Sequence, residues 1–185
     1  MSGYRVYFEV MAEPLKALCR AAIAERRAIE LANDAMAKEL GGAGCWWRGD
    51  RVSAIAFPRE TGAPDGWKQV EGYSPNVIAA VPLRKSAAGK ALAKRIADAP
   101  RRPPWKPLLL ACGLPEEADW VNTSGFTFVT MSATWVDLPS ERFFLLCARA
   151  ANATWPFPDG LAEISEAQVN MAINEHNRLA EQAEK

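Results

Sequence analysis

Histidine is nearly absent from this chain, which has a single one, His176, among its 185 residues. A serine triad or a cysteine–histidine pair would have to use that residue. His176 falls on or beside the apolar stripe of a predicted helix, where a packed, hydrogen-bonded imidazole is the common role. The sequence therefore gives little support to histidine-dependent catalysis.

The usual signatures of metal and cofactor sites are also missing. The four cysteines show no C-x-x-C spacing, and the chain contains no G-x-G-x-x-G, H-E-x-x-H, G-x-S-x-G or EF-hand loop. We expect no metal site and no cofactor. Scattered cysteines, the lack of a secretory signal and the lack of an apolar run of ~20 residues predict a cytoplasmic protein with no membrane partner.

An excess of charge of one sign is absent as well. Lysine and arginine total 22, as do aspartate and glutamate, so a nucleic-acid partner is disfavoured overall, although a local basic patch remains open. Apolar residues make up 49% and charged residues 24%, which is ordinary for a globular protein. The length predicts one globular domain over residues 1–185.

What is present predicts an α+β fold. Alternation over 4–10 predicts a half-buried strand, and the apolar stripe over 14–40 predicts a long helix. Shorter elements are predicted as follows: a hairpin over 45–57, a loop over 58–75, a buried strand or an inward loop over 77–81, a short helix over 108–112, an antiparallel pair from 126–136 and 142–148, and a last helix from Ser165. We expect a mainly antiparallel sheet of four to six strands, with the long N-terminal helix and the C-terminal helix packed on it.

The stretch 84–100 carries the clearest binding signal. Arg84 and Lys85 precede Ser86, a good N-cap, and Gly89-Lys90 lies in the first turn of the predicted helix. Free N–H groups and cations at a helix start favour an anion. The stretch is not a P-loop, because the first glycine and the hydroxyl residue of that motif are replaced. The alternative is a surface helix with solvated cations.

Tryptophans in predicted loops or element ends could complete such a site. Aromatic faces stack on nucleobases, and nearby cations, which include Arg48, Arg101 and Arg102, hydrogen-bond phosphate. The predicted ligand-binding residues are Arg84, Lys85, Ser86, Gly89, Lys90, Trp46, Trp47, Trp67 and Trp105. The alternative is that the tryptophans fill separate hydrophobic gaps.

The stretch G-W-K-Q-V-E-G-Y-S-P, followed by R-K-S-A-A-G-K-A-L-A-K-R-I, resembles a group of small proteins of unknown function encoded in proteobacterial phages and prophages. The matching positions are Trp67, Tyr73, Pro75, Ser86, Gly89 and Lys90. Ser86 stands where threonine is expected, and 77–82 is longer than the usual spacer. The resemblance implies a cytosolic phage accessory protein and supplies no activity and no catalytic residues.

The leading hypothesis is a non-enzymatic accessory protein that binds an anionic small ligand such as a nucleotide, and so sequesters a host signalling molecule as counter-defence. The first alternative is a protein-interaction module that inhibits a host protein through Trp155, Phe157 and the proline-rich segment 100–107. The long helix would suit a homodimer, which the sequence leaves open.

The second alternative is an enzyme, which the sequence disfavours without excluding. Its general acids or bases would be Glu116, Glu117 and Asp119, and its nucleophile would be Cys45. No pattern fixes partners for these groups, so no catalytic residue is predicted.

Overall fold

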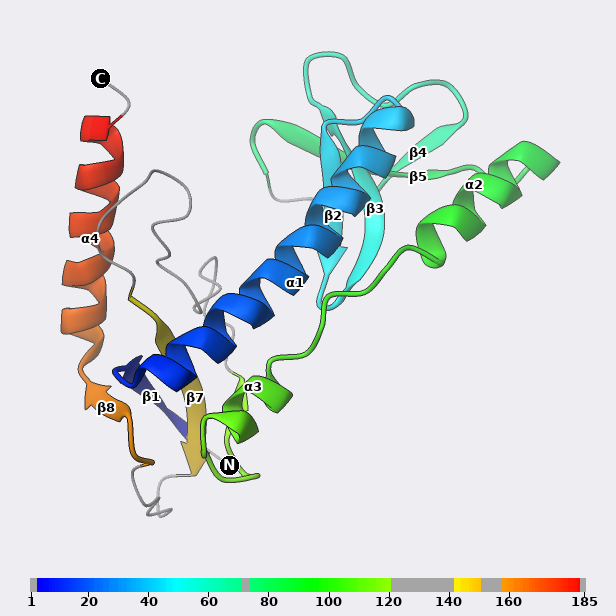
Figure 1. Cartoon of the computed structure of the whole chain (residues 1–185). Helices are drawn as coiled ribbons and strands as arrows, with labels where there is room; N and C mark the ends of the chain where they lie inside the picture. Colours follow the sequence, from blue (N-terminus) through cyan, green and yellow to red (C-terminus); the bar gives the residue numbers. More distant parts are fainter. Residues whose placement is uncertain (1–2, 71–73, 121–141, 151–157, 184–185) are drawn as a thin grey trace. The chain divides into compact units, whose positions relative to one another are not determined.

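A computed structural model describes residues 3–70, 74–120, 142–150 and 158–183 (Figure 1). Helices and antiparallel strands are both abundant, so the predicted α+β class is confirmed. The elements are β1 (Gly3–Val10), α1 (Glu13–Glu39), β2 (Gly44–Arg48), β3 (Arg51–Pro58), β4 (Trp67–Val70), β5 (Val77–Pro82), α2 (Ala87–Ala97), α3 (Lys106–Ala111), β6 (Asp119–Trp120), β7 (Phe144–Ala150), β8 (Leu161–Ile164) and α4 (Glu166–Ala183).

The chain divides into two compact units, and the division falls within α1. Unit 1 consists of Met1–Ile23 and Trp105–Lys185, and unit 2 consists of Ala24–Pro104. Each unit has its own antiparallel sheet, in the order β6-β7-β1-β8 in unit 1 and β2-β3-β5-β4 in unit 2. The strands within the described residues thus form two sheets, whereas the sequence predicted one. The prediction of a single domain over 1–185 stays a prediction.

Unit 1 buries both faces of its two central strands. Alternate residues of β1 and β7, such as Phe8 and Leu145, pack with α3 and the first turns of α1. Their neighbours, such as Tyr7 and Phe144, pack with Val169 of α4 on the other face. The expected central position of the 142–148 strand is confirmed. The half-buried reading of 4–10 is wrong at Tyr7, which is 6% exposed because α4 covers that face.

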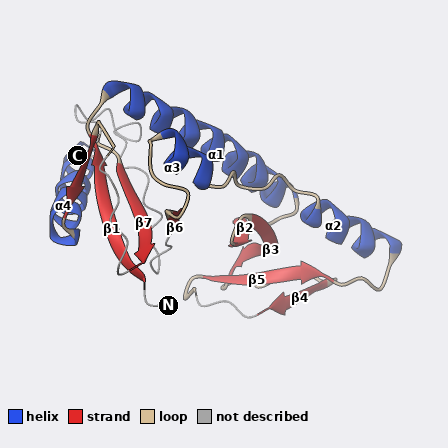
Figure 2. Cartoon of the chain, turned by 90° about the horizontal axis from the view of Figure 1, so that it is seen from below, coloured by secondary structure: helices blue, strands red, loops and turns tan. Residues whose placement is uncertain are grey.

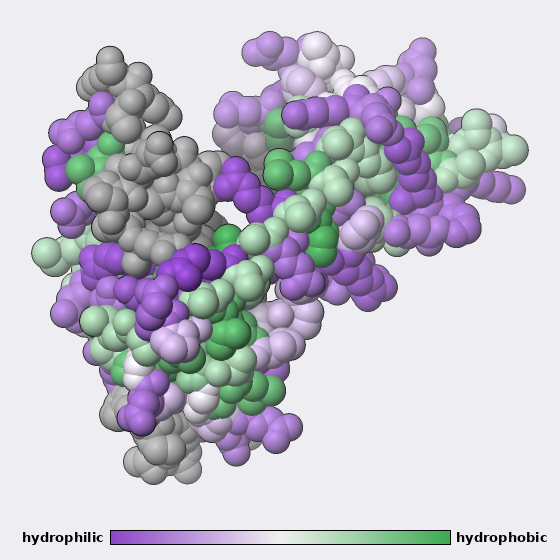
Figure 3. Space-filling view, viewed as in Figure 1, coloured by the Kyte–Doolittle hydropathy of each residue, from purple (hydrophilic) through white to green (hydrophobic). Residues whose placement is uncertain are grey.

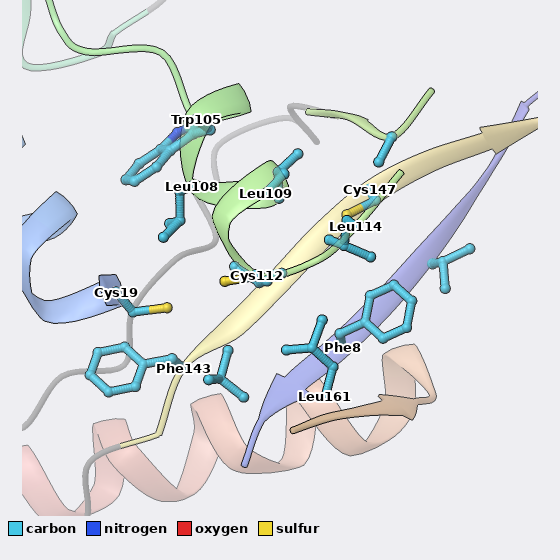
Figure 4. Packing of buried hydrophobic residues seen from close by; sticks show 14 residues of the cluster. Phe8, Cys19, Trp105, Leu108, Leu109, Cys112, Leu114, Phe143, Cys147 and Leu161 are labelled. Atoms are coloured by element: carbon cyan, nitrogen blue, oxygen red, sulfur yellow. The ribbon is translucent and has the colours of Figure 1, made fainter. Parts of the chain in front are cut away.

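Three of the four cysteines lie in the core of unit 1. Cys19 of α1, Cys112 after α3 and Cys147 of β7 are buried among apolar side chains (Figure 4). All four cysteines of the chain are free thiols. The Cys19 thiol hydrogen-bonds to Cys112, and with burial this raises the pKa of Cys19 far above its usual range. These thiols are therefore packing residues.

Unit 2 covers one face of its sheet with helices. The predicted hairpin is confirmed as β2 and β3, joined by a turn in which Gly49 has φ 64°. Ala37 of α1 and Ile96 of α2 pack with Phe57 and other apolar residues of β3 and β5. Figure 2 shows α2 and the C-terminal half of α1 on the same side of this sheet. The 77–81 segment is the buried strand β5.

The predicted loop over 58–75 contains a short strand, β4. Trp67 pairs with Pro82, and Val70 pairs with Ala79, so β4 is an edge strand next to β5. The ring of Trp67 meets that of Phe57 edge-on, with centroids 5.0 Å apart. Four residues are too few to show a period, and the surrounding glycines and prolines favour a loop assignment. The segment 67–70 is a strand because it pairs with β5.

Several predictions fall outside the described residues. These are the strand 126–136, the anchors Trp155 and Phe157, and Tyr73 of the resemblance.

An apolar stripe follows α1 in Figure 3, and Leu31 on that helix is 57% exposed. Within the described ranges, no helix is long and apolar enough to cross a bilayer. The homodimer stays a prediction.

Candidate anion-binding site

The start of α2 is built as the sequence predicts. Ser86 is the N-cap in an extended conformation, with φ −122° and ψ 164°. Its Oγ accepts a hydrogen bond from the backbone N–H of Gly89 at 3.0 Å. This bond satisfies one of the free amides of the first turn. The Ser86 hydroxyl is therefore already used as a cap.

Gly89 has a packing role at this helix start. A Cβ at Gly89 would lie 2.0 Å from the carbonyl oxygen of Leu83, a distance no real contact tolerates. Gly89 is buried, whereas Arg84, Lys85 and Lys90 are exposed. The glycine lets α2 approach the chain that leaves β5, and this places Arg84 beside the helix.

A cleft of about 240 Å³ lies between α2, β3 and β5 in unit 2. Three arginines from separate segments line it: Arg51 at the start of β3, Arg84 before α2, and Arg101 after α2. Its other lining residues are mostly apolar, namely Val52, Ser53, Val81, Pro82, Ala93, Ile96 and Ala97. We name it the three-arginine cleft. It combines guanidinium donors with an apolar floor.

The charges around the three-arginine cleft are only partly balanced. Asp50 faces two of the arginines: Oδ1 lies 3.8 Å from Nε of Arg51, and Oδ2 lies 3.7 Å from Nη1 of Arg101. Arg84 makes no ion pair or hydrogen bond with other parts of the described chain. Three guanidinium groups and one carboxylate give the site a formal net positive charge.

Unit 2 as a whole is basic, although the complete chain is neutral. Residues 24–104 contain fourteen lysines and arginines against nine aspartates and glutamates, a formal net charge of +5. Unit 1 carries the opposite balance, with eight basic and thirteen acidic residues. The net charge of the complete chain is zero because the two units balance each other, and the positive charge of unit 2 favours anions.

Three of the four predicted tryptophans lie in the sheet of unit 2, next to cleft residues. Trp47 pairs with Val52 and Trp67 pairs with Pro82, while the carbonyl of Trp46 accepts a hydrogen bond from Ser53. None of these rings is among the lining side chains. The three are half-buried. The three tryptophans therefore neighbour the cleft in the sheet without lining it.

The remaining indole, Trp105, is in the core of unit 1. It is 8% exposed and packs with Leu108 and its neighbours near the start of α3. Trp47 has a partner of its own, because the guanidinium of Arg102 lies 4.0 Å above its ring. Trp105 therefore lies in a unit other than the one that contains the cleft, and the ring of Trp47 is in contact with Arg102.

The predicted residues therefore separate into two groups. Arg84 lines the three-arginine cleft, whereas Lys85, Ser86, Gly89 and Lys90 do not. Arg101 was one of several loop cations in the sequence, and Arg51 has no sequence signal beyond its place after a turn. Strand pairing and the packing of α2 bring Arg51 and Arg101 to Arg84, and no local pattern encodes that convergence.

The candidate nucleophile Cys45 has a half-buried, hydrogen-bonded thiol. Burial, with a contribution from Asp34, raises the pKa of the Cys45 thiol to about 11. Its Sγ donates to the carbonyl of Asn33 at 3.1 Å. Glu116 and Glu117 are exposed. No group of three or more histidine, cysteine, aspartate or glutamate side chains in the described part of the chain is arranged to hold a metal.

No protein-family model, no curated protein and no solved structure matches this chain. The resemblance to phage-encoded proteins accordingly stays a prediction. The cleft has to be interpreted from its own chemistry.

Proposed function

We propose that this protein is a non-enzymatic binder of an anionic small ligand, that the ligand is a nucleotide, and that the three-arginine cleft holds it. The supporting observation is the meeting of Arg51, Arg84 and Arg101 around one apolar floor. Guanidinium groups bind phosphate oxygens through paired, charge-assisted hydrogen bonds. The floor formed by residues such as Val81 and Ile96 suits the sugar or base.

The size of the three-arginine cleft favours a small nucleotide. Its volume of about 240 Å³ is below the ~300–1,000 Å³ of ordinary ligand pockets. A mononucleotide, with part of its base projecting from the cleft, suits this volume better than a dinucleotide. The basic character of unit 2 favours the approach of either.

The biological setting is also part of the proposal, and it rests on the resemblance. An accessory protein of a phage or prophage would sequester a host signalling nucleotide in the cytoplasm as counter-defence. Four free thiols are in keeping with a reducing compartment.

The test is titration calorimetry with adenosine 5′-monophosphate and the other common mononucleotides, comparing wild type with Arg84→Ala and Lys85→Ala. The two variants each remove one exposed positive charge from adjacent positions, but only Arg84 lines the cleft. We expect Arg84→Ala to weaken binding at least about tenfold, the cost of one or two charge-assisted hydrogen bonds. Lys85→Ala should change it less than about threefold.

Two results would count against this proposal. If no mononucleotide binds the wild type, the proposed function is wrong. If both variants weaken binding equally, the ligand sits at the exposed helix start and the cleft assignment is wrong.

A further inference from the structure

Asp50 occupies a distinctive position beside the three-arginine cleft. It lies in the turn between β2 and β3, and each of its carboxylate oxygens faces a different arginine. The oxygens lie 3.8 Å from Arg51 and 3.7 Å from Arg101. Asp50 thus offers to two of the three arginines the kind of negative oxygen that a ligand phosphate would offer.

The electrostatic interaction of Asp50 with these two arginines is weak. Both distances exceed the 2.7–3.2 Å of N–H···O hydrogen bonds, so the contacts are electrostatic and not directional. The side chains of Asp50, Arg51 and Arg101 are 51%, 60% and 61% exposed. Exposed pairs of this kind contribute little to stability. A phosphate can replace the carboxylate without breaking a hydrogen bond.

We infer that Asp50 lowers the affinity of the three-arginine cleft for anions, because its carboxylate competes with the ligand for Arg51 and Arg101. A bound phosphate takes the place of the Asp50 carboxylate. The inference rests on the proposed function. With Asp50 present, the formal charge of the three arginines falls from three to two. Every anionic ligand meets this reduced attraction, and a dianion loses more than a monoanion because the Coulomb energy scales with ligand charge.

If Asp50 only oriented the arginines, removing its charge would change the ligand affinity in the opposite direction. If the carboxylate mainly positions Arg51 and Arg101, removing its charge weakens binding; if it competes, removal strengthens binding. The backbone geometry does not depend on the carboxylate, because Gly49 adopts φ 64° and the carbonyl of Asp50 accepts from the N–H of Arg102 at 2.7 Å. Asp50→Asn therefore keeps the turn and removes only the charge.

The experiment is titration calorimetry of wild type and Asp50→Asn with three adenosine probes at pH 7.5. Adenosine 5′-monophosphate is a dianion at this pH, 3′,5′-cyclic adenosine monophosphate is a monoanion, and adenosine is neutral. The matched control is Glu39→Gln, which removes a carboxylate that pairs with Arg95 of α2, an arginine outside the cleft lining.

We expect Asp50→Asn to bind the dianion about two- to fivefold more tightly at 0.1 M salt, the monoanion by a smaller factor, and adenosine unchanged. Glu39→Gln should differ from wild type by less than half that factor. Weaker binding of the dianion by Asp50→Asn, or equal gains in both variants, would overturn the inference and leave the proposed function standing. A wild type that binds no nucleotide would overturn both.

Discussion

The carbonyl oxygen of Leu83 lies 2.0 Å from where a side-chain carbon of residue 89 would be, and glycine at position 89 avoids that clash. The contact fixes how closely α2 approaches the end of β5. It also determines where the chain between them, which carries Arg84, can run. The architecture of the cleft thus depends on a residue that does not line it.

We therefore expect Gly89→Ala to lower the free energy of unfolding by about 1–3 kcal/mol, the usual cost of overpacking. At an unobstructed helix position, the same change would stabilise the protein by up to about 1 kcal/mol. The sign of the change in the free energy of unfolding therefore shows whether the clash with Leu83 exists. Urea unfolding followed by tryptophan fluorescence measures it. Ala88→Gly, at the exposed neighbouring position, calibrates the intrinsic helix cost of about 0.5–1 kcal/mol. If the Gly89→Ala variant were more stable than wild type, the Leu83 carbonyl could not lie as close to position 89 as the structure has it.

Glu30 of α1 lies between two arginines of unit 2. Its Oε1 is 3.3 Å from Nε of Arg26 and 2.7 Å from Nε of Arg102, the latter an ion pair without hydrogen-bond alignment. Burial, followed by the charge of Arg102, lowers the pKa of Arg26. Glu30→Gln should cost about 1–3 kcal/mol, because two neighbouring cations lose their shared counter-charge.

The control for Glu30→Gln is Glu25→Gln, which removes the same charge from an exposed position on the same helix. We expect a change within about 0.5 kcal/mol for that control. Unfolding at 1 M salt should recover part of the loss in Glu30→Gln, since salt screens the repulsion between Arg26 and Arg102. Equal stability of the two variants would show that Glu30 contributes no more than a surface charge.

The Cys45 thiol should make unit 2 less stable at alkaline pH. In the unfolded chain a cysteine ionises near pH ~8.5, whereas burial raises the pKa of Cys45 to about 11. Between these values the folded protein binds more protons, so the free energy of unfolding falls as pH rises. Cys45→Ser keeps a donor toward the Asn33 carbonyl and removes the titration. Urea unfolding under reductant at pH 8, 9 and 10 should therefore give a shallower pH slope for Cys45→Ser than for wild type.

The slopes are compared because other groups titrate in the same direction. Burial also raises the pKa of Cys147 to about 12, and burial with Glu166 raises that of Tyr7. These contributions are common to both proteins and cancel in the difference. Identical slopes would mean that Cys45 titrates normally in the fold.

The sequence predicted what local chemistry determines. Ser86 caps α2 because a hydroxyl at that position meets a free amide, and Gly49 turns the hairpin because it adopts positive φ easily. Ser165 and Gln168 form the expected capping box of α4. Each of these features involves residues within a few positions of one another.

Features set by distant parts of the chain were not predictable in the same way. The approach of Arg51 and Arg84 depends on the pairing of β3 with β5, for example Ile55 with Ala80. The division into two sheets depends on β1 pairing with β7, more than a hundred residues away. Apolar patterns show that such strands are buried but do not name their partners.

The same long-range pairing of β1 with β7 creates the ion pair of Glu9 with Arg142. Nε and Nη2 of Arg142 donate to the two carboxylate oxygens of Glu9 at 2.7 and 2.9 Å, and its guanidinium lies 5.2 Å from the ring centroid of Phe144. A paired fork of this kind suits arginine and not lysine. A double-mutant cycle with Glu9→Gln and Arg142→Met should give a coupling energy of about 1 kcal/mol, moderated because the Arg142 side chain is 40% exposed. Arg142→Lys should lose most of that coupling although it keeps the charge. A coupling energy near zero, or full retention by lysine, would show that the fork adds nothing beyond a surface charge.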